Sequence, residues 1–265
     1  MLKLYLLPLL LFLAACANPY RSTNRQYRQQ VKQYAKILKQ YPLQDSAGIQ
    51  PSPQWVGTVN FSMRKPNFVV IHHTAQDHCN QTLKTFTLQR TQVSAHYVIC
   101  KDGTLHHMLN DYLRAWHAGA GKWGNVTDLN SVSVGIELDN NGKEPFPEAQ
   151  MQTLYVLSDR LKRAYNIPAE NFIGHADLAP TRKNDPNINF NWKEMAHKGF
   201  GKWYSDTTGV VLPPDFNAIS ALRLIGYDLR DTNAVIVTFK RKFLQEEKDT
   251  TLSESAKKVL YLLSR

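Results

Sequence analysis

Three residues of the sequence carry metal-binding side chains and stand where predicted strands end. His72 closes a continuous apolar run that begins at Phe68, while His175 and Asp185 bracket a polar ten-residue loop. Two histidines and one carboxylate suit a catalytic zinc site, which keeps a fourth position for water and lowers its pKa to about 7. A single histidine is more often a hydrogen-bonded structural residue. The joint placement of the three residues nevertheless predicts a zinc centre.

Two further charged residues are candidates for catalysis beside such a centre. Glu137 is a carboxylate in the otherwise apolar segment 133–138, where a charge is costly unless it is paired or used. We expect it to be the general base, and a buried salt bridge is the alternative. Lys183 precedes Asp185 by two residues, so in an extended stretch both side chains leave the backbone on the same side. Its ammonium could stabilise an oxyanion, or it could be a solvated surface lysine.

The segments that carry these residues alternate between strand and helix patterns. Continuous apolar runs predict strands buried on both faces. Apolar residues at helical spacing predict a helix that begins at Pro147 and stops before Pro168. The predicted strands are residues 68–72, 95–100, 133–138 and 171–174. We therefore expect an α/β domain over residues 55–204, with a mixed central sheet flanked by helices.

A change of composition marks a second, smaller unit over residues 205–265. Asp215 is expected to open its first helix, which ends at Gly226, while Thr232 opens the second and Ser253 the third. The apolar residues at helical spacing form its predicted core: Phe216, Ile219, Leu222, Ile225, Phe239, Val259, Leu260 and Leu263. This pattern predicts a small three-helix domain.

The N-terminal segment predicts export and a lipid anchor. The apolar run over residues 4–15 is shorter than the about 20 residues that a bilayer requires, so residues 1–16 are expected to be a signal peptide. Its end, Leu-Ala-Ala-Cys, resembles the lipobox of bacterial lipoproteins. The resemblance implies that Cys16 is acylated and anchors the chain to a membrane, and an ordinary cleaved signal is the alternative.

Residues 17–54 have the pattern of a basic tether. They contain no acidic residue before Asp45, and the apolar residues from Tyr27 to Tyr41 recur at helical spacing until Pro42 would end the helix. This basic amphipathic helix could lie on anionic lipid headgroups or pack on the catalytic domain. A linker rich in proline follows it.

Two cysteines remain once Cys16 is set aside. Cys79 and Cys100 form an even pair in a chain that is expected to be exported to an oxidising compartment. A disulfide between them is plausible, and two free thiols are the alternative because the sequence does not show whether the geometry permits a bond.

Five ordered motifs resemble type 2 N-acetylmuramoyl-L-alanine amidases, a family that includes animal peptidoglycan-recognition proteins and phage amidases. The motifs are VIHHT at 70–74, AHY at 95–97, WHAG at 116–119, VGIE at 134–137 and GHADLAP at 174–180. The resemblance spans residues 55–204. It implies zinc at His72, His175 and Asp185, catalytic roles for Glu137 and Lys183, and hydrolysis of the bond between N-acetylmuramic acid and L-alanine in peptidoglycan or muropeptides.

The rest of the chain fits the same family. Residues 205–265 look like a peptidoglycan-binding domain, and the combination with a lipobox resembles periplasmic amidases of the outer membrane. Trp116, His117 and His96 are expected to line the substrate cleft, although they could equally be core residues. The GxGxxG string at 119–124 follows no buried strand, so we reject a dinucleotide site.

Competing functions fit the sequence less well. A peptidoglycan-binding protein without activity is the main alternative, and the intact ligand set argues against it. A metalloprotease of the HExxH type would need a string that does not occur. The net charge of +10 points to an anionic partner. Much of the charge lies near the expected anchor, so cell wall and lipid explain it better than nucleic acid.

Overall fold

The computed structural model divides the chain into two units, residues 1–62 and 63–265. The residues described are 18–40, 54, 56–247 and 249–265. The predicted lipobox with Cys16 and most of the predicted linker lie outside the described residues. In the first unit, the basic segment forms α2 (Arg21–Leu38), none of whose residues is buried. No helix in the described part of the chain is both long and apolar enough to span a membrane.

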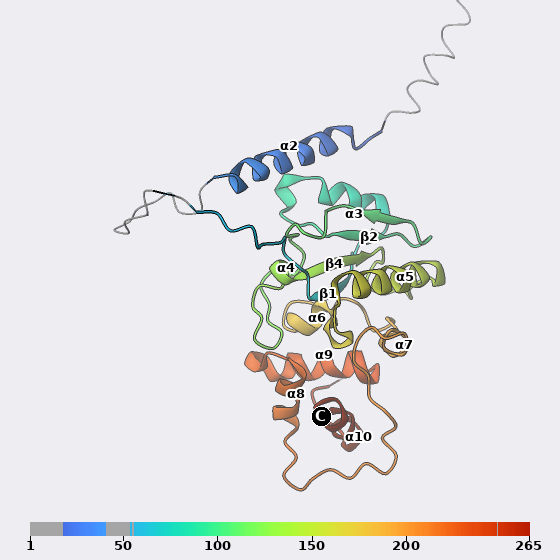
Figure 1. The fold of residues 1–265 in the computed structure, drawn as a ribbon. Helices are drawn as coiled ribbons and strands as arrows, with labels where there is room; N and C mark the ends of the chain where they lie inside the picture. Colours follow the sequence, from blue (N-terminus) through green and yellow to red (C-terminus); the bar gives the residue numbers. More distant parts are fainter. Residues whose placement is uncertain (1–17, 41–53, 55, 248) are drawn as a thin grey trace, which may run out of the picture. The chain divides into compact units, whose positions relative to one another are not determined.

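A five-stranded sheet forms the centre of the second unit, with the order β3-β2-β4-β1-β5 (Figure 1). The strands are β1 (Phe68–His73), β2 (Tyr97–Ile99), β3 (Leu105–His107), β4 (Ser133–Leu138) and β5 (Phe172–Gly174). Neighbouring strands are parallel except for β2 and β3, which are antiparallel. The predicted mixed sheet is therefore confirmed, and β3 is a strand that the sequence patterns did not predict.

One face of the sheet packs against α5 (Glu148–Tyr165). Leu154 and Leu161 of this helix are buried against strand residues such as Ile71 and Ile136. A fully buried leucine contributes about 1.5–3 kcal/mol to folding, so this layer is a main source of stability. The helix ends at Asn166, whose left-handed backbone stops it before Pro168, as predicted.

The opposite face carries the chemically active residues. Here Val70 and Ile173 pack with Ala118 and Leu178 in a smaller apolar cluster. Two one-turn helices border this face, α4 (Leu129–Val132) before β4 and α6 (His175–Leu178) directly after β5. The remaining helices of this part are α3 (Cys79–Phe86) and α7 (Trp192–His197), with short 3-10 turns at Gln89–Thr91 and Ala169–Asn171.

Three further helices with their own core form the C-terminal part, as predicted. They are α8 (Ala218–Ile225), α9 (Thr232–Leu244) and α10 (Glu254–Leu263), with a 3-10 turn at Leu229–Asp231. Leu222, Phe239 and Leu260 are fully buried between them, whereas Ile219, predicted as core, is 39% exposed. In Figure 1, α9 lies beside α6, and α10 lies beyond α9.

Two of the predicted helix starts are wrong by a residue or two. The side chain of Asn217, rather than Asp215, caps α8 by accepting a hydrogen bond from the backbone N–H of Ser220. Asp231, rather than Thr232, caps α9. Asparagine, aspartate and threonine are all common capping residues, and suitable residues stand close together at both helix starts. Residue type alone therefore did not locate the cap. The prediction for Ser253 is confirmed.

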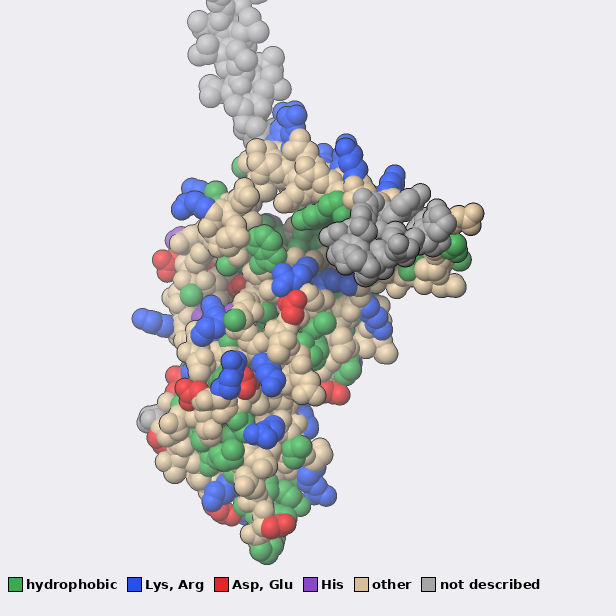
Figure 2. All heavy atoms as spheres, turned by 90° about the vertical axis from the view of Figure 1, so that its left-hand side faces the viewer, with side chains coloured by type: hydrophobic (Ala, Val, Ile, Leu, Met, Phe, Trp, Pro, Cys, Tyr) green, Lys and Arg blue, Asp and Glu red, His purple; other side chains and the backbone are tan. Residues whose placement is uncertain are grey.

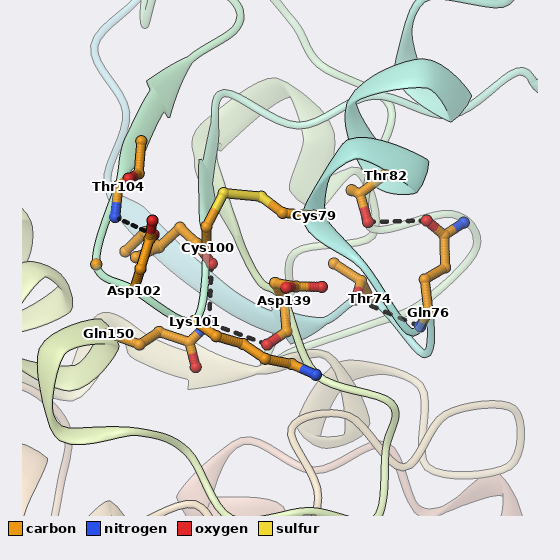
Figure 3. Close-up of a disulfide and its surroundings, with 12 residues drawn as sticks. Thr74, Gln76, Cys79, Thr82, Cys100, Lys101, Asp102, Thr104, Asp139 and Gln150 are labelled. Atoms are coloured by element: carbon orange, nitrogen blue, oxygen red, sulfur yellow. Dashed lines mark hydrogen bonds between the residues drawn. A yellow bond between two sulfur atoms is a disulfide. The ribbon is translucent and has the colours of Figure 1, made fainter.

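A disulfide joins the start of α3 to the residue after β2. Cys79 and Cys100 are bonded, with their Cα atoms 5.4 Å apart (Figure 3). Near it, the Thr82 hydroxyl of α3 donates a 2.8 Å hydrogen bond to Gln76 in the preceding loop. The disulfide therefore fixes the start of α3 to the end of β2, next to the edge strand β3.

Replacing both cysteines with serine is expected to lower the free energy of unfolding by about 3 kcal/mol, because the bond closes a loop with a sequence separation of 21 residues. Urea denaturation would measure the change. Adding a thiol reductant should destabilise the original chain and leave the double variant unaffected. Equal midpoints for the two proteins under oxidising conditions would contradict the prediction.

Charges of both signs are distributed over the surface of the protein. On the face shown in Figure 2, Lys and Arg side chains are interspersed with Asp and Glu. Several of the acidic side chains are paired, for example Asp128 with Arg114 at 2.9 Å and Glu144 with Lys101 at 2.7 Å. The basic side chains visible on this face thus do not form a single continuous patch.

Candidate active site

The ends of two parallel strands bring the histidines of the candidate site together. Ile71 of β1 lies opposite Gly174 of β5, where β5 ends and the chain turns into α6 at His175. The Nδ1 atoms of His72 and His175 are 2.9 Å apart. Ligands of open α/β sheets commonly bind at this carboxyl edge of the strands.

Asp185 completes the cluster from the loop after α6. The backbone carbonyl of Asp185 accepts a 2.8 Å hydrogen bond from the backbone N–H of Ala176, which fixes the loop beside α6. Oδ2 of Asp185 lies 3.0 Å from Nδ1 of His72 and 3.0 Å from Nδ1 of His175. All three side chains are buried. The structure thus brings together the three residues that the sequence predicted as metal ligands.

Hydrogen bonds fix which nitrogen of His175 carries its proton. Nε2 of His175 lies 2.9 Å from the backbone carbonyl oxygen of Ala118. A carbonyl oxygen only accepts, so Nε2 must donate, and a neutral imidazole has a single N–H. In the neutral form of the ring, which is the form that binds a metal, Nδ1 of His175 therefore presents a lone pair toward Asp185.

A longer relay fixes His72 in the same way. The Ser133 hydroxyl donates to the carbonyl of Leu129, so its oxygen accepts from Nε2 of His117 at 3.2 Å. Nδ1 of His117 then accepts from Nε2 of His72 at 3.0 Å. Burial, with a smaller effect from His175, lowers the pKa of His72 to about 4, so the ring is neutral at pH 7. Its Nδ1 consequently also presents a lone pair.

With both rings neutral and protonated at Nε2, the cluster presents three lone pairs to its centre. They belong to Nδ1 of His72, Nδ1 of His175 and Oδ2 of Asp185. Two imidazole nitrogens and one carboxylate oxygen lie within 3.0 Å of one another, an arrangement that a cation would stabilise. Around tetrahedral zinc, with bonds of about 2.0–2.1 Å, ligand atoms would be separated by about 3.3 Å. The spacing is therefore close to what a metal ion needs, and the donor set is typical of zinc sites.

His96 and His117 support the site from within the core. The ring of His117 lies directly over Gly135 of β4, where a Cβ atom would collide with it. His96 accepts a 3.0 Å hydrogen bond from the backbone N–H of Gly135 and donates one to the carbonyl of Leu113. The relative exposures of His96 and His117 are 0% and 8%. The alternative that these two residues belong to the core fits their positions better than the predicted substrate contact.

Trp116 has a different environment from its neighbour in the sequence. It is 48% exposed, so its ring offers apolar surface to a ligand, whereas its backbone N–H is held by Ser94 at 2.9 Å. A substrate contact for Trp116 stays a prediction. The structure thus separates the three residues that we expected to line the cleft into two internal supports and one surface residue.

Glu137 lies beside His72 on the neighbouring strand. The two residues are paired in the register of β1 and β4, and paired residues of parallel strands point to the same side of a sheet. No salt bridge of Glu137 occurs within the described residues, and its Oε2 has no hydrogen-bond partner there. Burial, followed by the charge of Asp185, raises the pKa of Glu137 to about 8. An unpaired carboxyl with a raised pKa is suited to accepting and delivering protons.

Lys183 lies partly buried in the loop that leads to Asp185. Its positive charge counteracts the rise in the pKa of Glu137 and adds to the lowering of the pKa of His72. The ammonium therefore acts on the same group of side chains that surrounds the cluster. This position is compatible with the stabilisation of negative charge near the cluster.

The raised pKa of Glu137 predicts how the stability of the protein depends on pH in the presence of a chelator. Without a metal ion, burial is expected to keep native Glu137 protonated up to about pH 8, whereas the unfolded chain releases the proton above 4.5, so this carboxyl lowers stability as pH rises between those values. Glu137→Gln removes the effect. The melting temperature of the variant, relative to the original chain, should therefore increase from pH 5 to pH 8. A bound cation would lower the pKa again and leave Glu137 able to accept a proton.

A suitable control for this comparison is Glu144→Gln. The hydrogen bond with Lys101 lowers the pKa of Glu144, so its titration falls below pH 5 in both states. Melting temperatures of the control and the original chain should differ by a constant amount over the same range. A constant difference for Glu137→Gln as well would show that native Glu137 is not held protonated.

Two groups of the site were missed in the sequence. The carbonyl of Ala118 orients His175, but a backbone oxygen has no signal in residue type. Ser133 orients His117 from the start of β4, and it shares its side of the strand with Gly135 and Glu137. The alternation of small or polar residues at 133, 135 and 137 within an apolar strand was a signal that could have revealed this face.

Comparison with known proteins agrees with this geometry. The family model described as N-acetylmuramoyl-L-alanine amidase matches residues 62–188. N-acetylmuramoyl-L-alanine amidase AmiD of Escherichia coli is 33% identical over 206 residues, which cover 66% of this chain and 74% of that protein. 1,6-Anhydro-N-acetylmuramyl-L-alanine amidase AmpD of Haemophilus influenzae is 34% identical over 107 residues, covering 40% of this chain and 58% of that one.

Solved structures extend the similarity to most of the described chain. The E. coli AmiD complex with anhydro-N-acetylmuramic acid-L-Ala-D-gamma-Glu-L-Lys superposes with a TM-score of 0.68 at 28% identity, covering 78% of this chain and 91% of that one. AmpDh3 of Pseudomonas aeruginosa gives 0.69 at 26% identity, with 81% and 97% covered. The chain therefore belongs to the N-acetylmuramoyl-L-alanine amidases, which hydrolyse the amide bond between N-acetylmuramic acid and L-alanine in peptidoglycan or its fragments.

Proposed function

We propose that the amidase depends on a zinc ion held by His72, His175 and Asp185. The observation that carries this proposal is the convergence of two imidazole nitrogens and one carboxylate oxygen, 2.9–3.0 Å apart, while the Nε2 atom of each ring contacts an acceptor outside the cluster. When bound, zinc would polarise the scissile carbonyl and make a water molecule acidic enough to attack it near neutral pH. The hydroxyl and thiol nucleophiles of other amide hydrolases are then not required.

The remaining charged residues have separate roles in this proposal. Glu137, with its unpaired Oε2, accepts a proton from the attacking water and later delivers one to the departing amine of L-alanine. Lys183 stabilises the negative charge that develops on the carbonyl oxygen of the substrate. His117 and the carbonyl of Ala118 keep the rings of His72 and His175 oriented, as outer partners of metal ligands commonly do.

The first experiment is to incubate the full chain in detergent with purified peptidoglycan fragments, with and without a chelator. Release of peptides that begin with L-alanine, detected by mass spectrometry, is expected; the chelator should abolish it and added zinc should restore it. Hydrolysis that persists after complete removal of metal would contradict the zinc proposal. Intact fragments that still sediment with the protein would instead support a binding function without catalysis.

We also propose that anhydro-muropeptides are among the substrates. Two of the similar structures contain ligands of this class, namely E. coli AmiD with an anhydro-N-acetylmuramyl tripeptide and P. aeruginosa AmpDh3 with an anhydromuramic pentapeptide. The same assay should therefore be run on intact wall, on reduced muropeptides and on anhydro-muropeptides. Hydrolysis of intact wall or reduced muropeptides without any hydrolysis of anhydro-muropeptides would contradict the proposal.

The location of the enzyme is proposed from the N-terminal segment. We infer that Cys16 is acylated and that the chain is anchored to a membrane of the cell envelope, on the periplasmic face of the outer membrane, with residues 17–54 as a tether. The absence of any buried residue on α2 is consistent with a tether. Cys16→Ala should move the protein from the membrane fraction to the soluble fraction, and unchanged partitioning would refute the anchor.

A role in peptidoglycan binding is proposed for residues 205–265, next to the catalytic domain at 55–204. The resemblance of this segment to peptidoglycan-binding domains supports the proposal, and its own three-helix core provides a folded unit that could carry the role. Sedimentation of the chain with insoluble wall in the presence of a chelator would test binding without hydrolysis.

A further inference from the structure

Two residues of the C-terminal helices reach the helix that carries His175. Lys242 of α9 forms a 2.5 Å ion pair with Oδ2 of Asp177, and the hydroxyl of Tyr227, next to α8, donates a 2.9 Å hydrogen bond to Oδ1 of the same carboxylate. All three side chains are buried. The ammonium of Lys242 also lies 4.1 Å from the ring centroid of Trp192, a cation–π distance. This contact between catalytic and C-terminal parts is therefore closed to water.

Asp177 is bound to the first turn of α6, which begins at His175. Its Oδ2 accepts a 2.8 Å hydrogen bond from the backbone N–H of Gly174, the residue at which β5 ends. Asp177 thus bridges the strand end and the helix start on either side of His175. Fixing Asp177 in place also restricts the backbone from which the imidazole of His175 projects.

The residues Gly226 and Tyr227, which follow α8, also lie beside a second segment that orients His175, namely the loop after Ala118. The backbone N–H of Gly124 donates to the carbonyl of Gly226 at 2.6 Å, and the ring of Trp123 lies so close to Gly226 that a Cβ atom there would collide with it. Trp123 also packs edge-on against Tyr227, with centroids 5.0 Å apart. This loop begins with Ala118, whose carbonyl accepts the hydrogen bond from Nε2 of His175.

We propose that Tyr227 and Lys242 are positioning residues for the metal centre, acting through Asp177 on His175. The C-terminal helices would then be part of the scaffold of the active site, in addition to any role in holding the wall. The inference rests on the proposed zinc site. It assigns a second role to residues 205–265, for which the sequence resemblance implied only wall binding.

A wall-binding role alone makes a different prediction from a positioning role. If the C-terminal helices only bind substrate, altering Tyr227 or Lys242 would raise KM for polymeric wall and leave metal affinity unchanged. If they position His175, the affinity of the free enzyme for metal changes even when no substrate is present. Metal affinity therefore separates the two roles without a measurement of activity.

The test uses two variants of the full chain with matched controls. Tyr227→Phe deletes one hydroxyl and leaves the ion pair of Asp177 with Lys242, so the fold should be retained; Lys242→Met removes the charge. The control for tyrosine is Tyr204→Phe, because among the described residues the hydroxyl of Tyr204 donates a hydrogen bond to the carbonyl of Phe243 and to no residue of the metal cluster. The control for lysine is Lys240→Met, a buried lysine of α9 that pairs with Asp249.

The measurement is the dissociation constant of Zn²⁺ by competition with a chromophoric chelator, together with the visible spectrum of the Co²⁺-substituted proteins. We expect zinc affinity to fall about tenfold in Tyr227→Phe and further in Lys242→Met, within the range found for outer partners of metal ligands. The cobalt bands should change in position or intensity because the geometry of His175 changes. Both controls should match the original chain.

Two results would overturn the inference, and they are distinguishable. If the original chain binds zinc tightly and folded Tyr227→Phe and Lys242→Met bind it equally well with unaltered cobalt spectra, the positioning role is refuted while the zinc site stands. If the original chain binds no zinc, the proposed function fails and the inference fails with it. A rise in KM for wall at constant zinc affinity would leave substrate binding as the sole role.

Discussion

Asp185→Ala is expected to abolish both zinc binding and hydrolysis. Asp185 supplies the only carboxylate of this cluster of described residues, beside the two imidazole nitrogens of His72 and His175. Its removal leaves two neutral nitrogens, which is one ligand fewer than catalytic zinc sites use. The loss of zinc affinity should exceed the about 10–100-fold that loss of an outer partner costs. Chelator competition and peptide release would measure the two effects.

Asp128→Ala is a matched control for this experiment. It removes an exposed aspartate that pairs with Arg114 and is not one of the three donors of the cluster, so zinc binding and turnover should both persist. The backbone bond between Ala176 and Asp185 does not involve the side chain, and the circular dichroism spectrum of Asp185→Ala should show a folded protein. Full zinc occupancy in folded Asp185→Ala would show that the ligand set is wrong.

The second large effect is expected for Glu137→Gln, which should keep zinc and lose hydrolysis. The amide has nearly the shape of the carboxyl but cannot take up a proton, so kcat should fall by about 10²–10⁴-fold, the usual contribution of general acid–base catalysis. Zinc affinity should change little because Glu137 is outside the cluster of three donors. The contrast with Asp185→Ala separates the proton path from the metal ligands.

Glu144→Gln provides the comparison for Glu137. This carboxylate pairs with Lys101 and does not belong to the cluster, so its variant should retain normal turnover. Zinc content by atomic absorption and initial rates on anhydro-muropeptides would be measured for both proteins. Turnover of Glu137→Gln at the rate of the original chain would assign the proton transfer to another group.

The metal ligands could be predicted from the sequence because their residue types are rare where they occur. A continuous apolar run predicts a buried strand, and His72 at its end is costly there unless it is used. The resemblance of the five motifs implied the same three ligands, His72, His175 and Asp185. Spacing alone would not have shown that residues 113 positions apart in the chain meet within 3.0 Å.

Other features depend on contacts between distant segments and could not be predicted in this way. The strand β3 is short and partly exposed, so it has little apolar pattern in the sequence. It forms because β2 pairs with it in antiparallel register. The interior position of His96 follows from its hydrogen bond to Gly135, 39 residues away. The bridge from Lys242 to Asp177 joins two parts that the sequence suggested as separate domains.

Gly135 has a consequence for interpreting related sequences. The imidazole of His117 occupies the space that a side chain at this strand position would fill, and that imidazole holds His72. A homologue could therefore keep every metal ligand and still lose the orientation of one of them through a single methyl group. Genome surveys that sort active wall hydrolases from inactive wall receptors should score this strand position together with the ligands.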